Sequence, residues 1–176
     1  NRFNYVELTS NSVDVSALNK QLKQAAVDAD ETYNWFLSFR EPGDFFVKAE
    51  TKITYNQDGY LSVSIYEEDD YLMPRVNSFL IDMETGKRLT ISDVFKTKQQ
   101  REELFQKVKS ELRRLGEASS NPVYREDRLA FDENWGIAAN EDGYIVIINH
   151  GNSISAANIV DIYELRIPFT YGEPLK

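Results

Sequence analysis

The only histidine in the chain, His150, is the first residue to test for acid–base chemistry, because imidazole titrates near neutral pH. It stands in the stretch "NHGNS", directly after an apolar run. A serine triad would need a nucleophile elbow of the type G-x-S-x-G, and neither this motif nor S-x-x-K occurs. The chain contains no cysteine, which excludes a thiol nucleophile. His150 is therefore interpreted as a loop residue at the end of a strand, with a general base as the alternative.

Four consecutive acids, Glu67, Glu68, Asp69 and Asp70, are the second candidate. They could bind a hard cation or attract a basic partner, and the alternative is a solvated loop. No H-E-x-x-H motif and no EF-hand calcium loop is present, so we expect neither a metal nor another cofactor. Glycoside hydrolysis needs two carboxylates across a cleft, and no pair stands out among the 29 acidic residues. The sequence thus predicts no catalytic residues and indicates a protein that is not an enzyme.

The charge balance narrows the classes of partner. The formal net charge is −9, and binding to a nucleic acid requires a basic face, so no nucleic acid is expected. Cationic partners would be attracted instead. Trp35 and Trp135 could stack on sugar rings, but a tryptophan in an amphipathic helix or a strand is typical of a core, and we predict both to be buried.

Apolar residues at three- and four-residue steps predict a helix that runs from Val15 to Phe36 and ends before Pro42-Gly43, with Asp14 or Ser16 as its cap. Strict alternation then predicts a strand over 45–55 in which Phe45 and Tyr55 share one face. The turn at Asp58-Gly59 predicts a hairpin with a second strand over 61–66.

The acids at 67–70 are expected to interrupt the sheet before a third strand over 76–83. A Thr85-Gly86 turn, a short strand over 88–90, an N-cap at Ser92 or Asp93 and a long helix over 98–116 follow. A second Asp-Gly hairpin at 140–144 leads into the apolar run "YIVIINH", which is typical of a central strand, and a last strand stops at Pro168. These elements predict an α+β fold: mainly antiparallel sheets, with two longer helices packed on them, in one domain of residues 1–176.

The motifs, taken in order, resemble a known family. The stretch "FLIDMETGKRLTISDVF" looks like the family's strand, Asp-x-x-Thr-Gly-Lys turn and Leu-Ser-Asp-Leu-Phe segment. The stretches "ITYNQDGYLSVSIYEE", "NEDGYIVIIN" and "SISAANIVDIYELRIPF" resemble its first hairpin, closing hairpin and last strand. The family is the extracytoplasmic domain shared by RsiV-type anti-sigma factors and PdaC-type peptidoglycan deacetylases, and many members are uncharacterised. The resemblance covers nearly the whole chain, and it implies two packed segments, about 1–70 and 71–176.

The resemblance implies an exported, non-catalytic sensing or binding domain. In RsiV-like proteins the domain binds lysozyme, so a cationic secreted protein such as lysozyme, or cell-wall glycan, is the expected partner. The location implied is extracytoplasmic, at the cell surface or secreted, with membrane attachment only through an N-terminal anchor outside this sequence, which begins without Met at Asn1-Arg2-Phe3. The alternatives are an accessory glycan-binding module of an envelope enzyme and a carboxylate-dependent glycan hydrolase.

Two segments depart from the family pattern and are expected to face the partner. The family's Gly-Gly-Ala-His-Gly-like turn is replaced by "YEEDDYLMPRVNSF", and its aromatic segment near the end by "NSISAANIV". Acids beside apolar side chains are common at interfaces. The predicted partner-binding residues lie in the loops 67–75 and 150–158, and they are Glu67, Glu68, Asp69, Asp70, Tyr71, Leu72, Met73, His150 and Asn152.

Overall fold

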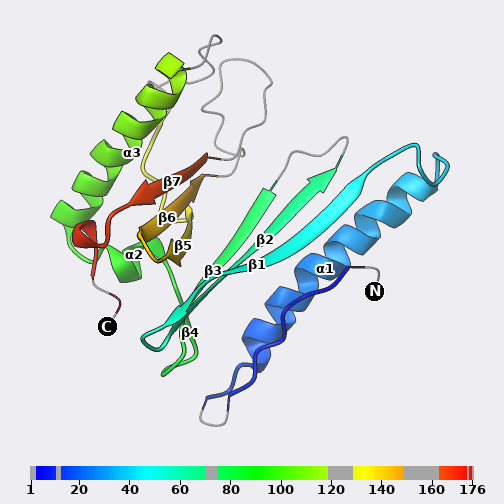
Figure 1. Cartoon of the computed structure of the whole chain (residues 1–176), viewed down its shortest axis with the longest axis horizontal. Helices are drawn as coiled ribbons and strands as arrows, with labels where there is room; N and C mark the ends of the chain where they lie inside the picture. The colour runs from blue at the N-terminus through cyan, green and yellow to red at the C-terminus, as the bar shows by residue number, and fades with distance from the viewer. Residues whose placement is uncertain are drawn as a thin grey trace.

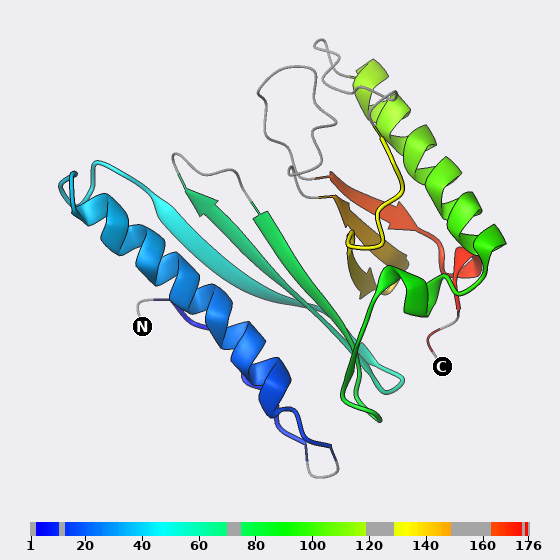
Figure 2. The same ribbon diagram turned by 180° about the vertical axis from the view of Figure 1, so that it is seen from behind.

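Two antiparallel sheets pack on each other between two long helices, in the order helix, sheet, sheet, helix (Figures 1 and 2). The computed structural model describes residues 3–10, 13–69, 75–118, 129–148, 163–173 and 175. The predicted α+β class is confirmed. Among the described residues, no helix is both long and apolar enough to cross a membrane.

The first sheet has the strand order β1-β2-β3-β4, and the second has the order β5-β6-β7. The four strands of the first are β1 (Val47–Gln57), β2 (Tyr60–Asp69), β3 (Arg75–Asp82) and β4 (Lys87–Leu89). The three strands of the second are β5 (Gly136–Asn140), β6 (Gly143–Ile148) and β7 (Tyr163–Ile167). The helices are α1 (Ser16–Leu37), α2 (Ile91–Val94), α3 (Lys98–Ala118) and the 3₁₀ turn η3 (Phe169–Tyr171). The apolar run after the second Asp-Gly turn is the central strand β6, as predicted.

Helix α1 covers one face of the first sheet. Its buried positions repeat the predicted spacing, and they pack on side chains of β2 and β3 such as Val63 and Phe79. Residue Val15 occupies the N-cap position without a side-chain cap, although Asp14 Oδ1 accepts a hydrogen bond from the Ser16 N–H at 2.9 Å. The predicted capping residues are therefore wrong in detail, and the helix is held by its apolar face.

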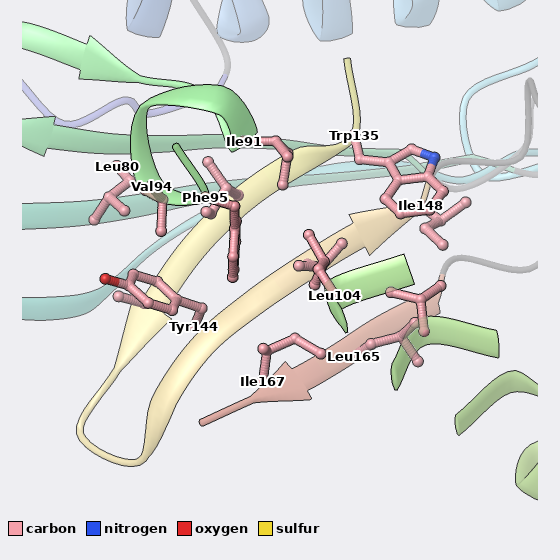
Figure 3. Packing of buried hydrophobic residues seen from close by; sticks show 14 of the residues in the cluster. Leu80, Ile91, Val94, Phe95, Leu104, Trp135, Tyr144, Ile148, Leu165 and Ile167 are labelled. Atoms are coloured by element: carbon pink, nitrogen blue, oxygen red, sulfur yellow. The ribbon is translucent and has the colours of Figure 1, made fainter. Parts of the chain in front are cut away.

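The outer face of the second sheet packs on α2 and α3 and forms the larger core (Figure 3). The labelled residues of this core in Figure 3 are Leu80, Ile91, Val94, Phe95, Leu104, Trp135, Tyr144, Ile148, Leu165 and Ile167. The side chain of Trp135 is only 4% exposed and lies against the rings of Phe105 and Phe131, which confirms the prediction that it belongs to the core.

Small side chains line the contact between the two sheets. The hydroxyl oxygen of Ser62 accepts the Ala139 N–H at 3.0 Å, so β2 and β5 are joined by a hydrogen bond as well as by packing. A Cβ atom added to Gly136 would lie 2.8 Å from Ser78 Oγ, which is closer than such atoms approach. Glycine at 136 and serine at 62 and 78 thus set how closely the sheets approach.

The strand β1 carries a bulge that the sequence pattern does not reveal. Ile53 pairs with Val63, and Tyr55 then pairs with Ser62, so one extra residue enters β1 between these two pairs. The bulge turns Tyr55 away from the α1 face and into the larger core. The prediction that Tyr55 shares a face with Phe45 is therefore wrong.

The Thr85-Gly86 turn lies between β3 and β4, and a capped short helix, α2, follows directly. Gly86 has φ of +69°, a conformation that favours glycine, and it ends a turn after β3. The N-cap of α2 is Thr90, whose hydroxyl accepts from the Asp93 N–H while the Asp93 carboxylate accepts from the Thr90 N–H. Asp93 is thus the N3 residue of a capping box, and the prediction that Ser92 or Asp93 is the N-cap is wrong.

Candidate functional site

Strand β2 continues through the first three residues of the acidic run, so these residues do not form the expected loop. The register pairs Glu67 with Ala49, Glu68 with Lys48 and Asp69 with Val47. Because neighbouring residues of a strand point to opposite faces, Glu67 lies on the α1 face and Glu68 on the other. The structure therefore separates two of the predicted partner-binding residues instead of bringing them together.

The remaining predicted residues lie outside the described part of the chain. They are Asp70, Tyr71, Leu72, Met73, His150 and Asn152. The predicted recognition loops 67–75 and 150–158 are consequently described only over 67–69 and at 75. Their role in binding stays a prediction.

On the α1 face, the carboxylate of Glu67 is fixed by a neighbour on β3. The side-chain amide of Asn77 donates to Glu67 Oε1 at 2.7 Å, and both side chains are in contact with solvent. A carboxylate offers several acceptor sites, and one that stays in contact with solvent can accept a donor from a partner. Glu67 is thus the best-defined acceptor of the predicted set.

On the opposite face, basic and acidic side chains alternate along the edge strand β1, and its lysines offset the negative charge of Glu68. The Nζ atom of Lys48 lies 2.9 Å from Glu50 Oε2, and Lys52 lies 3.6 Å from the same oxygen. The hydrogen bond from Lys48, and the charges of both lysines, hold the pKa of Glu50 below its usual value, although some burial opposes this. These exposed pairs contribute little to stability, and lysines on an edge strand discourage pairing with another chain.

A tyrosine links this face to the second sheet. The Tyr66 hydroxyl donates to Glu164 Oε1 at 2.6 Å, and the Lys52 ammonium lies 4.6 Å from the centre of the Tyr66 ring. Partial burial and the Glu164 carboxylate raise the pKa of Tyr66 far above its usual value. Tyr66 therefore stays protonated at every physiological pH and acts as a hydrogen-bond donor between β2 and β7.

A cluster of aromatic rings lies at the C-terminal end of α1, which is the end of the molecule where β1 begins and β2 ends (Figures 1 and 2). Phe36 is fully buried and stacks on Phe45 with 5.1 Å between ring centres. Trp35 contacts both Phe36 and Phe39, at 5.0 Å and 4.8 Å. The side chain of Trp35 is 56% exposed and that of Phe39 is 54% exposed, so the prediction that Trp35 is a core residue is wrong.

A hollow of about 620 Å³ adjoins the exposed rings. Its lining comes from the end of α1 and the following turn, and consists of Leu37, Ser38, Phe39, Arg40, Glu41 and Asp44. The Arg40 guanidinium donates to the backbone carbonyl of Asp44 at 3.0 Å, and Ser38 Oγ donates to the Trp35 carbonyl at 2.6 Å. These bonds hold the turn that carries the polar groups.

The helical spacing already contained a signal for this cluster. The apolar stripe of α1 passes through Ala29, Tyr33 and Phe36, and Trp35 falls off this stripe. The segment keeps helical hydrogen bonding past the end of α1, since the Arg40 N–H donates to the Phe36 carbonyl at 3.0 Å. Trp35 and Phe39, four residues apart, therefore lie on one side.

A second pocket, of about 270 Å³, lies where β4 leaves β3. Its main charged group is Arg88, which donates to the Ser78 carbonyl at 2.6 Å and to Gln21 Oε1 at 3.2 Å, and stacks on the Phe79 ring. These contacts give Arg88 a structural role at the end of the β3–β4 ladder. Within the described residues, no group of three or more His, Asp or Glu side chains could hold a metal ion.

The structure is similar in fold to two solved proteins of the DUF3298 family. One, from Pseudomonas aeruginosa PAO1, has a TM-score of 0.56 and 17% identity, and the match covers 96% of this chain and 89% of the other. The other, from Bacteroides fragilis, has a TM-score of 0.50 and 14% identity, and the match covers 86% of this chain. This chain spans 63% of the length of the B. fragilis protein. No family model and no curated protein matches the sequence. The shared fold is that of a domain of unknown function.

Proposed function

We propose that the protein is an exported, non-catalytic binding domain that recognises a cationic cell-wall-related protein, of which lysozyme is the representative. The full-length protein would be held at the cell surface by an N-terminal anchor, as in the RsiV-type anti-sigma factors that the sequence resembles. The observation that carries the proposal is the position of Glu67, a solvated carboxylate on the α1 face near the end of β2. The end of β2 and the C-terminal end of α1 lie at the same end of the molecule (Figure 1), and the exposed rings of Trp35 and Phe39 lie at that end of α1.

The charge of the whole chain supports this choice of partner. A net charge of −9 speeds the encounter with a cationic protein at low salt. Protein interfaces commonly combine aromatic side chains that become buried with a polar rim around them, and exposed aromatic residues next to acids provide both.

Calorimetry with lysozyme tests the proposal. The wild type is compared with a variant that neutralises the acidic run, Glu67→Gln/Glu68→Gln/Asp69→Asn/Asp70→Asn. We expect binding to the wild type and an affinity at least about tenfold lower for the variant, since about 1.4 kcal/mol corresponds to a factor of ten. The variant must keep the circular dichroism spectrum and melting temperature of the wild type.

A matched control neutralises four other acids. Glu102→Gln/Glu103→Gln/Glu141→Gln/Asp142→Asn changes the net charge by the same amount, and these exposed residues lie on α3 and in the β5–β6 turn, on the α3 side of the molecule. If the acidic run is the contact, this control keeps most of the wild-type affinity. Equal losses in both variants would mean that only net charge matters, and absence of binding to the wild type would refute lysozyme as the partner.

A further inference from the structure

We propose that Trp35 and Phe39, with the adjoining hollow, form a binding site for the sugar rings of a β-1,4-linked glycan. We call Trp35, Phe39 and the hollow lined by Leu37, Ser38, Arg40, Glu41 and Asp44 the aromatic platform. This site does not include Glu67 or the acidic run, but it uses the same exposed rings as the proposed protein interface, so the test below has to tell the two ligands apart.

The rings of the platform are exposed and held in place from below. Phe36 and Phe45 form a buried base, and Tyr33 packs on Phe45 with 4.9 Å between ring centres. Trp35 and Phe39 rest on Phe36 at 5.0 Å and 5.8 Å and meet each other edge to face. Because these contacts restrict the side chains before any ligand arrives, little conformational entropy is lost on binding.

The hollow beside the rings offers both kinds of hydrogen-bonding partner. Arg40 carries a guanidinium, which only donates, and Glu41 and Asp44 carry carboxylates, which only accept. A sugar hydroxyl both donates and accepts, so it can use both sets. The hollow carries two acids and one base, and the excess of acid disfavours an anionic ligand, whereas a polyol can use both the donors and the acceptors.

Trp35 and Phe39 lie at 75° to each other, so a sugar ring would stack on the exposed face of one of them and contact the edge of the other. A β-1,4-linked pyranose with equatorial substituents has flat faces made of C–H groups, and these carry a partial positive charge. An aromatic face carries a partial negative charge, so the two attract, and the apolar surfaces are removed from water. Ligand sites commonly combine an apolar wall with a few fixed polar groups, as here.

Tryptophan fluorescence gives a direct test. The chain has two tryptophans, and Trp135 is only 4% exposed, so Trp35 accounts for the response to a surface ligand. The probes are N-acetylglucosamine oligomers linked β-1,4 and, as a second source of the same ring geometry, cello-oligosaccharides. We expect a saturable blue shift of emission and protection of Trp35 from acrylamide quenching, in the micromolar to low millimolar range.

Calorimetry with the same oligomers then locates the site. Trp35→Ala and Phe39→Ala should each weaken binding about tenfold or more, because each removes a stacking surface. The matched control is Ile53→Ala, since Ile53 is 54% exposed and lies on β1, outside the platform. This control should bind as the wild type does, and circular dichroism establishes that all three variants are folded.

Three results would overturn the proposal. The first is no saturable binding of either oligomer by the wild type. The second is binding that Trp35→Ala leaves unchanged, because the sugar would then occupy another surface. The third is loss of lysozyme binding in Trp35→Ala with no oligosaccharide binding, which would assign the platform to the protein interface. Failure of lysozyme to bind while oligomers bind would refute the proposed function and leave this inference standing.

Discussion

At the scale of single residues, Tyr66 is the side chain that connects the two sheets at their solvated end. Its hydroxyl donates to the Glu164 carboxylate at 2.6 Å, across 98 residues of sequence. The same ring lies under the Lys52 ammonium, so its position is fixed from two sides. A hydrogen bond to a charged group is stronger than one between neutral groups, although solvent weakens this one.

Removing the Tyr66 hydroxyl tests this connection. We expect Tyr66→Phe to lower the free energy of unfolding by about 1 kcal/mol. A double-mutant cycle with Glu164→Ala, which removes the acceptor, measures the coupling between the two side chains by urea denaturation. Additive effects in the cycle would contradict the connection, because two independent residues show no coupling energy.

Gly136 is the residue at which the distance between the sheets can be tested. Gly136→Ala places a methyl group 2.8 Å from Ser78 Oγ, and we expect a loss of about 1–3 kcal/mol from overpacking. Ser78→Ala alone should be nearly neutral, since its buried hydroxyl has no hydrogen-bond partner among the described residues. The double variant should recover part of the loss in urea denaturation, and an equal or larger loss would refute the explanation.

At the scale of elements, the short helix α2 depends on its capping box. Its four residues are too few to be stable alone, so the reciprocal bonds between Thr90 and Asp93 and the packing of its apolar residues hold it in place. Burial would raise the pKa of Asp93, but the hydrogen bonds from Lys87 and Thr90 outweigh it and hold the pKa below the usual 3.8.

The sign of this pKa shift predicts a pH dependence. A carboxylate with a lowered pKa in the folded state stabilises it above the unfolded pKa, and this contribution is lost as the pH falls through the folded pKa. Asp93→Asn should therefore be less stable than the wild type by about 0.5–2 kcal/mol at neutral pH, and the difference should shrink below about pH 4. Urea denaturation at both pH values measures it, with Asp142→Asn in an exposed turn as the control. A difference that is independent of pH would contradict the role of the Asp93 charge.

Most elements could be predicted because their signals are local. Each of these signals depends on residues that are close together in the sequence. They are the alternation in β2 and β3, the two Asp-Gly turns and the three- and four-residue steps of the apolar stripe of α1. The bulge between Ile53 and Tyr55 could not be predicted, because it depends on how β1 pairs with β2. In the sequence, the alternation of β1 continues without a break to Tyr55. The N-cap of α2 was misplaced because Thr90, Ser92 and Asp93 are all good cap residues, and the end of β4 decides among them.

The candidate site was less predictable than the fold. The sequence treated Glu67 and Glu68 as neighbours in one loop, whereas β2 places them on opposite faces. Trp35 was assigned to the core from its residue type, although its helical position lies off the apolar stripe. The helical spacing therefore predicts the exposure of Trp35, and residue type alone does not decide burial.

At the scale of the whole molecule, the residues proposed for recognition lie at one end of the first sheet. This end carries the C-terminal end of α1, the start of β1 and the end of β2 (Figure 2). The opposite, α3 side encloses the larger core (Figure 3). We therefore propose that recognition takes place at this end, whereas the larger core lies on the α3 side.

No ion is expected to hold the molecule together. Treatment with EDTA should leave the melting temperature unchanged, since a bound ion would stabilise the folded state in proportion to its affinity. Differential scanning calorimetry before and after treatment, with calcium added back, checks this. A fall of several degrees that calcium reverses would reveal a site, and repeating the measurement on Glu67→Gln/Glu68→Gln/Asp69→Asn/Asp70→Asn would tell whether it lies in the acidic run.

The rate at which lysozyme associates with the wild-type protein, measured at two salt concentrations, tests the central claim most directly. The range of electrostatic attraction falls from about 10 Å at 0.1 M salt to about 3 Å at 1 M. If a cationic protein is recognised through an acidic surface, association should be saturable at 0.1 M and at least about tenfold slower at 1 M. Absence of association, or a rate that does not change with salt, would contradict the account.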